Sequence, residues 1–143
     1  MKTVFLSILI FLSTPGVWLT DFDKARTIAS QENKHILLNF SGSDWCGPCI
    51  KMTRDIFESA VFKSFAEDNL VLVRADFPRM RKNQLETSLQ RHNEALAERY
   101  NPEGKFPLTL LLDENGKVIH EWDGYGNVTA EVFVERIQEL AGK

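Results

Sequence analysis

The sequence has few residues from which a metal centre or a nucleic-acid surface could be built. It contains only two cysteines and three histidines, and the histidines (His35, His92 and His120) have no ligand spacing with the cysteines or with one another. A structural zinc site needs about four such ligands. Basic residues are not in excess, because 17 Lys and Arg stand against 20 Asp and Glu, a net charge of -3. A duplex-binding protein needs a basic surface, so we expect neither a metal nor a nucleic-acid partner.

Long hydrophobic runs are also missing. The most apolar stretch, residues 4–12, is about half of the ~20 residues that a helix needs to cross a bilayer. It follows Lys2 and precedes the segment Ser-Thr-Pro-Gly at residues 13–16. A basic start, a short apolar stretch and a small or helix-breaking exit are the three parts of a secretory signal peptide. We therefore expect residues 1–18 to be a signal peptide and the protein to be periplasmic or otherwise exported. An uncleaved membrane anchor and a buried N-terminal strand are the two alternatives.

The size of the chain sets its domain count. A chain of 143 residues with 43% hydrophobic residues can build one domain around a single core, and is too short for two. No internal repeat is visible. We therefore expect one domain over residues 19–143, acting as a monomer.

Hydrophobic patterning divides the chain into alternating helices and strands. Residues 35–40 and 70–76 are short apolar runs, typical of strands covered on both faces, and Asn115-Gly116 is a strong hairpin signal. The expected helices span residues 21–32, 46–57, 59–67, about 84–100 and 129–140, and the expected strands span residues 35–40, 70–76, 108–113 and 118–122. This order predicts an α/β fold, a mixed sheet with helices on both faces. Both helical crossovers are expected to join parallel strands.

The two cysteines lie where a strand and a loop lead into a helix, in the string Trp45-Cys46-Gly47-Pro48-Cys49. Free backbone N–H groups at a helix start favour a negative charge, so a thiolate at Cys46 is stabilised there. Cys49 lies within one turn and can attack a mixed disulfide formed at Cys46. Pro48 suits a first helical turn, and Gly47 leaves room for an approaching backbone. This pattern predicts a redox-active pair.

The cysteine pair has two alternative interpretations. It could be half of a zinc site, but suitable partners at ligand spacing are missing. It could be a purely structural disulfide, but so short a loop contributes little loop-closure stabilisation.

The same residues resemble the thioredoxin family. Trp45-Cys46-Gly47-Pro48-Cys49 is the thioredoxin active-site string, and residues 41–46 look like exported bacterial thioredoxin-like proteins related to the C-terminal domain of the transmembrane disulfide reductase. The resemblance spans about residues 21–140. It implies a thioredoxin-like fold and disulfide exchange with protein substrates, with Cys46 and Cys49 catalytic. It also implies no cofactor beyond the Cys46–Cys49 disulfide, and an upstream redox partner for which a membrane disulfide reductase is a candidate.

The resemblance also suggests a set of substrate-binding residues. Phe106-Pro107 opens a strand and looks like the family's cis-proline, which faces the active-site pair and holds substrate backbone. Gly124 matches the substrate-groove glycine, and Trp45 matches the tryptophan that flanks the nucleophile. Gly47 and Pro48 complete the set. A trans proline at the start of a strand, a plain turn glycine and ordinary packing of the tryptophan are the corresponding alternatives.

Two departures from the family pattern stand out. Asn39 occupies the place of a usual buried Asp, with one extra residue before the first Cys, so the usual general base is missing. Asp44 is a nearby carboxylate, expected to be a solvated loop residue, and Arg74 is expected to face solvent. Residues 79–100 form a net basic, helical insertion before the cis-proline strand, longer than the thioredoxin link by roughly a dozen residues. It is either a partner-recognition helix or a solvated covering helix.

The sequence thus favours an enzyme. The Gly-Pro pair places no His between the cysteines to stabilise the thiolate further, which indicates a comparatively reducing pair, a reductase or isomerase helper in an oxidising compartment. The competing class is a non-catalytic adaptor or chaperone module on the thioredoxin fold.

Overall fold

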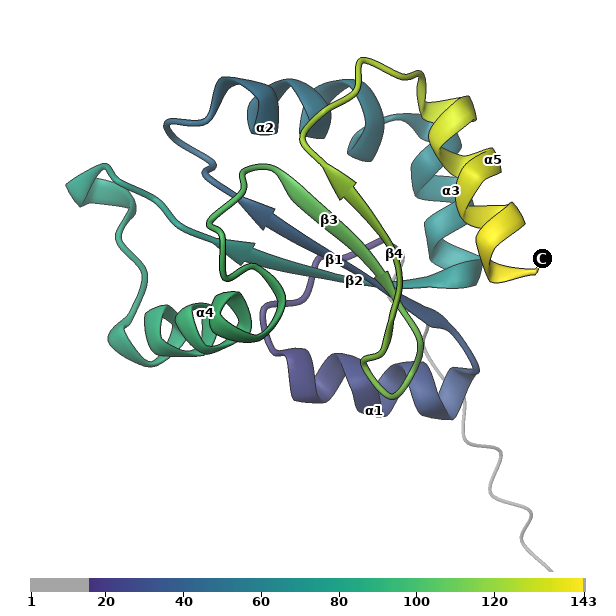
Figure 1. The fold of residues 1–143 in the computed structure, drawn as a ribbon, viewed down its shortest axis with the longest axis horizontal. Coiled ribbons are helices and arrows are strands. Elements are labelled where there is room, and N and C mark those ends of the chain that lie inside the picture. Colours follow the sequence, from purple (N-terminus) through teal and green to yellow (C-terminus); the bar gives the residue numbers. More distant parts are fainter. Residues whose placement is uncertain (1–15, 143) are drawn as a thin grey trace, which may run out of the picture.

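A computed structural model describes residues 16–142, and Figure 1 shows a central sheet with helices on both of its faces. The helices are α1 (Phe22–Glu32), α2 (Gly47–Met52), α3 (Ala60–Asn69), α4 (Thr87–Tyr100) and α5 (Ala130–Ala141), and the strands are β1 (His35–Ser41), β2 (Leu70–Asp76), β3 (Leu108–Leu112) and β4 (Val118–Asp123). A π-helical turn (Thr53–Phe57) continues α2, and a 3-10 turn (Arg81–Asn83) precedes α4. The predicted segments lie within a few residues of these bounds.

The sheet has the strand order β2-β1-β3-β4. β1 pairs parallel with β2 and antiparallel with β3, and β3 pairs antiparallel with β4. The predicted α/β class with a mixed sheet is confirmed. The expectation that both crossovers join parallel strands is wrong for the second one. The chain leaves β2, passes through α4 and enters β3 at the end of the sheet where β2 finished, so β3 runs in the opposite direction (Figure 1).

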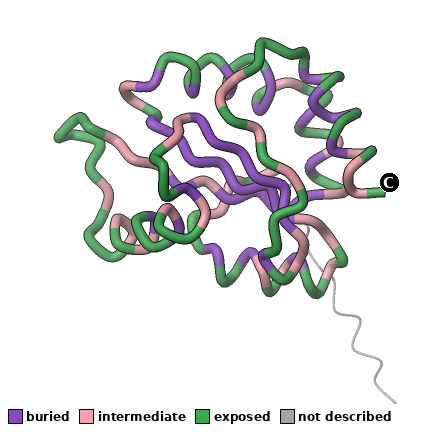
Figure 2. Tube along the Cα trace, in the orientation of Figure 1, coloured by how far each residue is buried: buried purple, intermediate pink, exposed green. Residues whose placement is uncertain are grey.

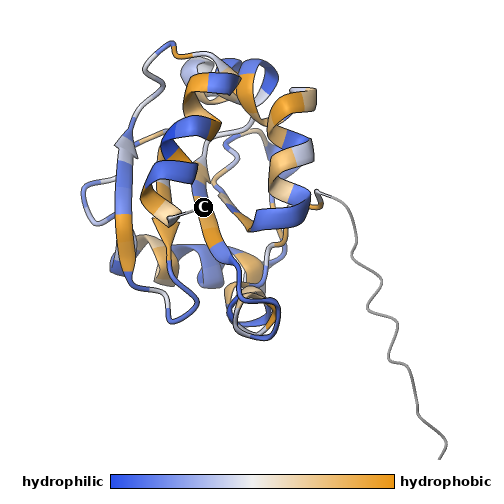
Figure 3. Cartoon of the chain, turned by 90° about the vertical axis from the view of Figure 1, so that its right-hand side faces the viewer, coloured by the Kyte–Doolittle hydropathy of each residue, from blue (hydrophilic) through white to orange (hydrophobic). Residues whose placement is uncertain are grey.

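Successive strand residues point to opposite faces of the sheet, and this alternation separates two cores. Ile36 and Leu38 face the side covered by α1 and α4, whereas Leu37 faces the side covered by α2, α3 and α5. Figure 2 shows β1, β2 and β3 buried almost throughout, whereas β4 is exposed or half-buried and the outward sides of the helices are exposed. Figure 3 shows hydrophobic and hydrophilic residues interspersed along the helices. This is expected for helices that turn one face towards the sheet and the other towards solvent.

Local signals determine where the helices begin and end. The Asp21 carboxylate accepts the Lys24 N–H at the start of α1, and Asn33 ends that helix in the left-handed conformation. The hydroxyls of Ser59 and Thr129 accept backbone N–H groups at the starts of α3 and α5. Such side chains satisfy N–H groups that have no partner inside the helix. The predicted boundaries at these positions are confirmed.

The N-terminal end of the described chain is part of the domain. Trp18 packs edge-on against Phe57, with ring centroids 5.0 Å apart. Leu19 forms an isolated parallel bridge to Val73 in β2. The folded domain therefore begins at Trp18 or earlier, at least one residue before the expected start at residue 19. The predicted signal peptide otherwise lies outside the described residues. No helix within residues 16–142 is long and apolar enough to span a membrane.

Candidate active site

Cys46 and Cys49 form a disulfide at the start of α2. Cys46 is the residue that caps α2, and its Sγ atom accepts the backbone N–H of Cys49 at 3.3 Å. Only 5% of Cys46 and 2% of Cys49 is exposed. Cys46 is thus the more exposed cysteine, as expected for the one that attacks the substrate first. In the disulfide form the difference in exposure is small. The helix start supplies a hydrogen-bond donor to the sulfur that would carry the negative charge.

Gly47 and Pro48 are the exposed first residues of α2. A Cβ atom added to Gly47 would meet no heavy atom of the described chain within 4 Å, so the surface at Gly47, next to Cys46, is open. Pro48 is placed where a missing N–H has no cost to the helix. A partner backbone can therefore approach the cysteines from this side.

Phe106, Pro107 and Gly124 come together at the same end of the sheet. The Phe106–Pro107 peptide bond is cis, which confirms the prediction for this bond. The Gly124 N–H donates to the Pro107 carbonyl at 2.8 Å, and Gly124 has φ +79°, the left-handed region that favours glycine. The Phe106 ring lies edge-on to the Trp45 ring at 5.4 Å. The predicted substrate-binding residues are thus brought together, and their role in binding stays a prediction.

Trp45 is fixed from several sides. Its Nε1–H donates to the Phe77 carbonyl at 2.7 Å. A Cβ atom at Gly42 would collide with the indole ring, so only glycine allows the loop to approach so closely. The Arg79 guanidinium lies over the ring, 3.6 Å from its centroid. The indole beside Cys46 is therefore held in one orientation.

Asp44 is not the free loop residue that we expected. Its carboxylate accepts the backbone N–H groups of Arg79 and Met80, each at 2.9 Å, and the Asn83 side-chain amide at 3.1 Å. These hydrogen bonds, the one from Arg79 foremost, lower the pKa of Asp44. A carboxylate with a lowered pKa is a poor proton acceptor near neutrality. Asp44 instead connects the active-site loop to the start of the insertion.

A row of polar residues crosses the sheet on the face that α2 covers. Asn39 in β1 is opposite both Arg74 in β2 and Thr109 in β3. Asn39 is only 2% exposed, and its side-chain amide donates to the Thr109 hydroxyl at 3.0 Å. The Thr109 hydroxyl lies 4.0 Å from the Met52 sulfur of α2, which places the row beneath that helix. The row contains no carboxylate, in line with the sequence.

Arg74 does not face solvent, contrary to our expectation. Its guanidinium lies 4.3 Å from the Trp18 ring centroid and 5.7 Å from that of Phe57. One of its terminal nitrogens is 3.5 Å from the Thr53 hydroxyl. Burial lowers the pKa of Arg74. Sequence reasoning missed this because the stacking partner, Trp18, lay within the predicted leader.

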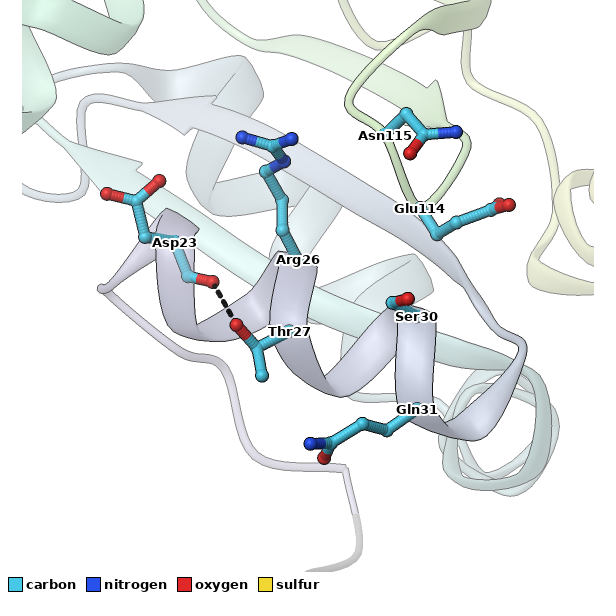
Figure 4. Close-up of a pocket in the computed structure, with 7 residues that line it drawn as sticks. All are labelled: Asp23, Arg26, Thr27, Ser30, Gln31, Glu114 and Asn115. Carbon is cyan, nitrogen blue, oxygen red and sulfur yellow. Dashed lines mark hydrogen bonds between the residues drawn. The ribbon is translucent and has the colours of Figure 1, made fainter.

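Several hollows lie outside the cysteine loop. A polar one of about 520 Å³ lies between α1 and the β3–β4 turn, lined by Asp23, Arg26, Glu114 and others (Figure 4). It is distant from α2 (Figure 1). An apolar one of about 210 Å³ lies beside α2 and is lined by Met52, Gly124, Tyr125 and Val132 among others. Within residues 16–142, no group of three or more His, Cys, Asp or Glu residues could hold a metal ion.

The geometry agrees with the proteins to which the chain is similar. Disulfide bond reductase DsbH of Chlamydia pneumoniae is 40% identical over 89 residues, 62% of this chain and 52% of the relative. Thioredoxin-related protein DsbJ of the same organism is 29% identical over 113 residues, 79% of this chain and 32% of the relative. The chain thus spans about half of the length of the first relative and about a third of the length of the second.

Solved structures give the same fold. The structure titled DsbH Oxidoreductase superimposes with a TM-score of 0.80 and 28% identity, covering 99% of this chain and 95% of that one. A thioredoxin from Thermus thermophilus superimposes with a TM-score of 0.61 and 13% identity, covering 83% and 82%, a likeness of fold alone. Residues 17–113 match the family described as thioredoxin-like. With the cysteine pair at the start of α2 and the cis-proline at the start of β3, the chain belongs to the thioredoxin-like family.

Proposed function

We propose that this protein is a thiol–disulfide oxidoreductase that exchanges disulfides with protein substrates through Cys46 and Cys49. The observation that carries the proposal is the Cys46–Cys49 disulfide at a helix start, where the Cys46 sulfur accepts a backbone N–H. The similarity to a relative named disulfide bond reductase supports the same class of reaction. No cofactor beyond the disulfide takes part.

The exchange follows from the positions of the two sulfurs. In the reduced protein, the Cys46 thiolate attacks a substrate disulfide, forms a mixed disulfide and releases one substrate thiolate. The Cys49 thiol loses its proton and attacks the Cys46 sulfur. The Cys46–Cys49 disulfide forms and the second substrate thiolate leaves. The substrate gains two electrons and the protein loses two, which a dithiol partner must restore.

The remaining site residues hold the substrate. Trp45 and the open surface over Gly47 and Pro48 flank the point of attack. The backbones of Pro107 and Gly124, joined by a hydrogen bond, form the opposite side of the approach. We assign Trp45, Gly47, Pro48, Phe106, Pro107 and Gly124 to substrate binding.

The direction of electron flow is towards the substrate. The pair encloses Gly47 and Pro48, and no cationic side chain between the cysteines stabilises the thiolate beyond the helix start. We predict a reduction potential closer to the value of about -270 mV typical of reductants than to the value of about -120 mV of strong oxidants. Equilibration in glutathione buffers measures it. A potential near the oxidant value would contradict a role as reductase or isomerase helper.

The setting of the reaction follows from the N-terminal pattern. We propose that the protein acts as a monomer outside the cytoplasm, after removal of an apolar leader, on substrates exposed to oxidation. Its electrons would come from an upstream redox partner such as a membrane disulfide reductase. Fractionation of the producing cells tests the location.

Insulin reduction by dithiothreitol, with and without the protein, tests the catalytic function. The parent should accelerate precipitation of the insulin B chain, and the Cys46→Ser variant should not. An adaptor or chaperone module that does not use its dithiol would give the same rate with both proteins, and that result would exclude the enzyme.

A further inference from the structure

The start of the insertion folds back onto the active-site loop. The segment 79–83 follows β2, and Asp44 accepts its Arg79 and Met80 N–H groups at 2.9 Å each. The Asn83 side chain adds a third hydrogen bond to the same carboxylate. Asp44, two residues before Cys46, is thereby joined to residues that follow it by 35 to 39 positions in the chain. Arg79 is thus held at the active-site loop through its backbone N–H, which leaves its side chain free of this role.

The side chain of Arg79 then lies flat on Trp45. Its guanidinium is 3.6 Å from the centroid of the indole ring. The indole is also held by the Phe77 carbonyl, which accepts its N–H, and by the Phe106 ring, which packs at a steep angle to it with the centroids 5.4 Å apart. Stacking uses the face of the guanidinium and leaves its N–H donors, which lie at the edge, available. These donors belong to an exposed residue that is stacked on Trp45, the residue directly before Cys46.

No acidic side chain of the described chain neutralises this group. Among residues 16–142, Arg79 forms no ion pair. Two carboxylates at the active-site loop are engaged elsewhere, since Asp44 accepts N–H groups of the segment 79–83 and Asp76 accepts the N–H and hydroxyl of Ser43. The segment also carries Arg81 and Lys82 and no acidic residue, although the chain as a whole has a net charge of -3. A pre-oriented cation without an ion-pair partner among residues 16–142 therefore lies on Trp45, the residue directly before Cys46.

We propose that Arg79 is a specificity-determining residue that binds a carboxylate of the partner segment passing over Cys46. The planar guanidinium fork matches a carboxylate with two parallel N–H···O bonds. Partners with Asp or Glu next to the reacting cysteine are then exchanged faster than partners with a neutral or basic residue there. This inference rests on the proposed function and adds the class of substrate.

Three disulfide-linked peptide dimers test the preference, each with one cysteine in a Gly-Ser background and Asp, Asn or Lys directly after it. The rate of reduction by the reduced protein is measured for each peptide. It is divided by the rate with dithiothreitol, which removes differences in the intrinsic reactivity of the peptides. The Asp-to-Asn ratio is independent of any effect of Arg79 on the Cys46 thiolate itself, because both peptides meet the same thiolate.

We expect an Asp-to-Asn ratio of about 3 for the parent at low salt, the size expected for an exposed ion pair. The ratio should fall towards 1 at high salt because screening weakens exposed charge pairs. Arg79→Gln should give a ratio of about 1, and Arg79→Lys an intermediate ratio, because it keeps the charge and loses the fork. Arg91→Gln, which removes an exposed arginine of α4, is the matched control and should keep the parent ratio.

Equal ratios in the parent and in Arg79→Gln would overturn the inference. So would an Arg79→Gln variant that slows all three peptides equally, because Arg79 would then only cover Trp45. A parent that reduces none of the peptides, including the Asn peptide that dithiothreitol reduces, would refute the proposed function and the preference together. The two failures are therefore distinguishable.

Discussion

At the scale of single residues, the two cysteines differ in what surrounds their sulfurs. The Cys46 sulfur accepts the Cys49 N–H, whereas Cys49 lies one turn further into the helix and is 2% exposed. We predict that Cys49→Ser accumulates mixed disulfides with substrate proteins, because Cys46 can attack but nothing resolves the product. Cys46→Ser should accumulate none. Non-reducing electrophoresis of both variants after incubation with an oxidised substrate checks this, and equal trapping by both would contradict the assignment.

Asn39 is the residue whose chemistry departs most from its family. It lies in the polar row beneath α2, bonded to the Thr109 hydroxyl. An amide has no titratable proton near neutrality, so it cannot take the proton of Cys49 during exchange. We predict that Asn39→Asp accelerates insulin reduction near pH 7, because a carboxylate beneath the helix can accept that proton.

The same variant should be less stable. Burial favours the neutral form of a carboxyl group and raises its pKa. The loss of stability, on the order of 2 kcal/mol, should thus be present at pH 7 and vanish as the pH falls below the ordinary carboxyl pKa near ~4. Thermal melts at pH 7 and pH 4 measure it. Asn39→Ala is the control, since it removes the Thr109 hydrogen bond without adding a carboxylate and should not accelerate exchange. An Asn39→Asp variant that is slower or more stable than the parent would refute the proposal that a carboxylate at position 39 accepts the Cys49 proton.

At the scale of elements, the insertion depends on one carboxylate. The hydrogen bonds to Arg79, Met80 and Asn83 stabilise ionised Asp44, and its pKa lies below the ordinary value of 3.8. Their contribution is therefore fully present above about pH 4 and is lost as the pH falls through the lowered pKa. We predict that Asp44→Ala releases the segment 79–83 at pH 7, seen as faster hydrogen exchange of the Arg79 and Met80 amides.

The parent should show the same release only below pH 4. Asp55→Ala is a matched control, because it removes another exposed carboxylate with a lowered pKa and should leave the Arg79 and Met80 amides protected. If Asp44→Ala leaves both amides as slow to exchange as in the parent, the anchoring role of Asp44 is wrong.

The elements also show how far sequence reasoning reaches. β1 and β2 were predictable because their apolar runs have local signals at both ends, and α1 because Asp21 and Asn33 mark its limits. The direction of β3 was not, since direction depends on the path of the connection and not on the residues of the strand. The cysteine pair and the cis-proline were found from short motifs. The contact of Asp44 with the insertion joins residues at least 35 positions apart and leaves no local pattern.

At the scale of the whole molecule, the domain includes its most N-terminal described residues. Trp18 stacks with Phe57 and Arg74, and Leu19 exchanges hydrogen bonds with the backbone of β2 at 2.8 and 2.9 Å. We therefore predict that any processing of the leader occurs before Trp18. N-terminal sequencing of the exported protein checks this, and a mature chain that begins at Leu19 or later would contradict it.

Two truncated chains measure the same contribution directly. A chain that begins at Val17 keeps Trp18 and Leu19, whereas a chain that begins at Thr20 loses them. The shorter chain should be less stable by on the order of 3 kcal/mol, the cost of removing a large packed aromatic side chain. Denaturant unfolding of the pair measures the difference. Identical midpoints would mean that Trp18 contributes nothing to the fold.

The bridge from Leu19 also covers part of the backbone edge of β2. β2 is one of the two edge strands, and near its middle the Leu19 N–H donates to the Leu72 carbonyl and the Leu19 carbonyl accepts the Arg74 N–H. An unpaired strand edge is a template on which another chain can add its own strand. A chain cut after Leu19 would expose these two backbone groups to its neighbours. We therefore expect concentrated protein to aggregate edge to edge more readily when the leader is cut after Leu19 than when it is cut before Trp18.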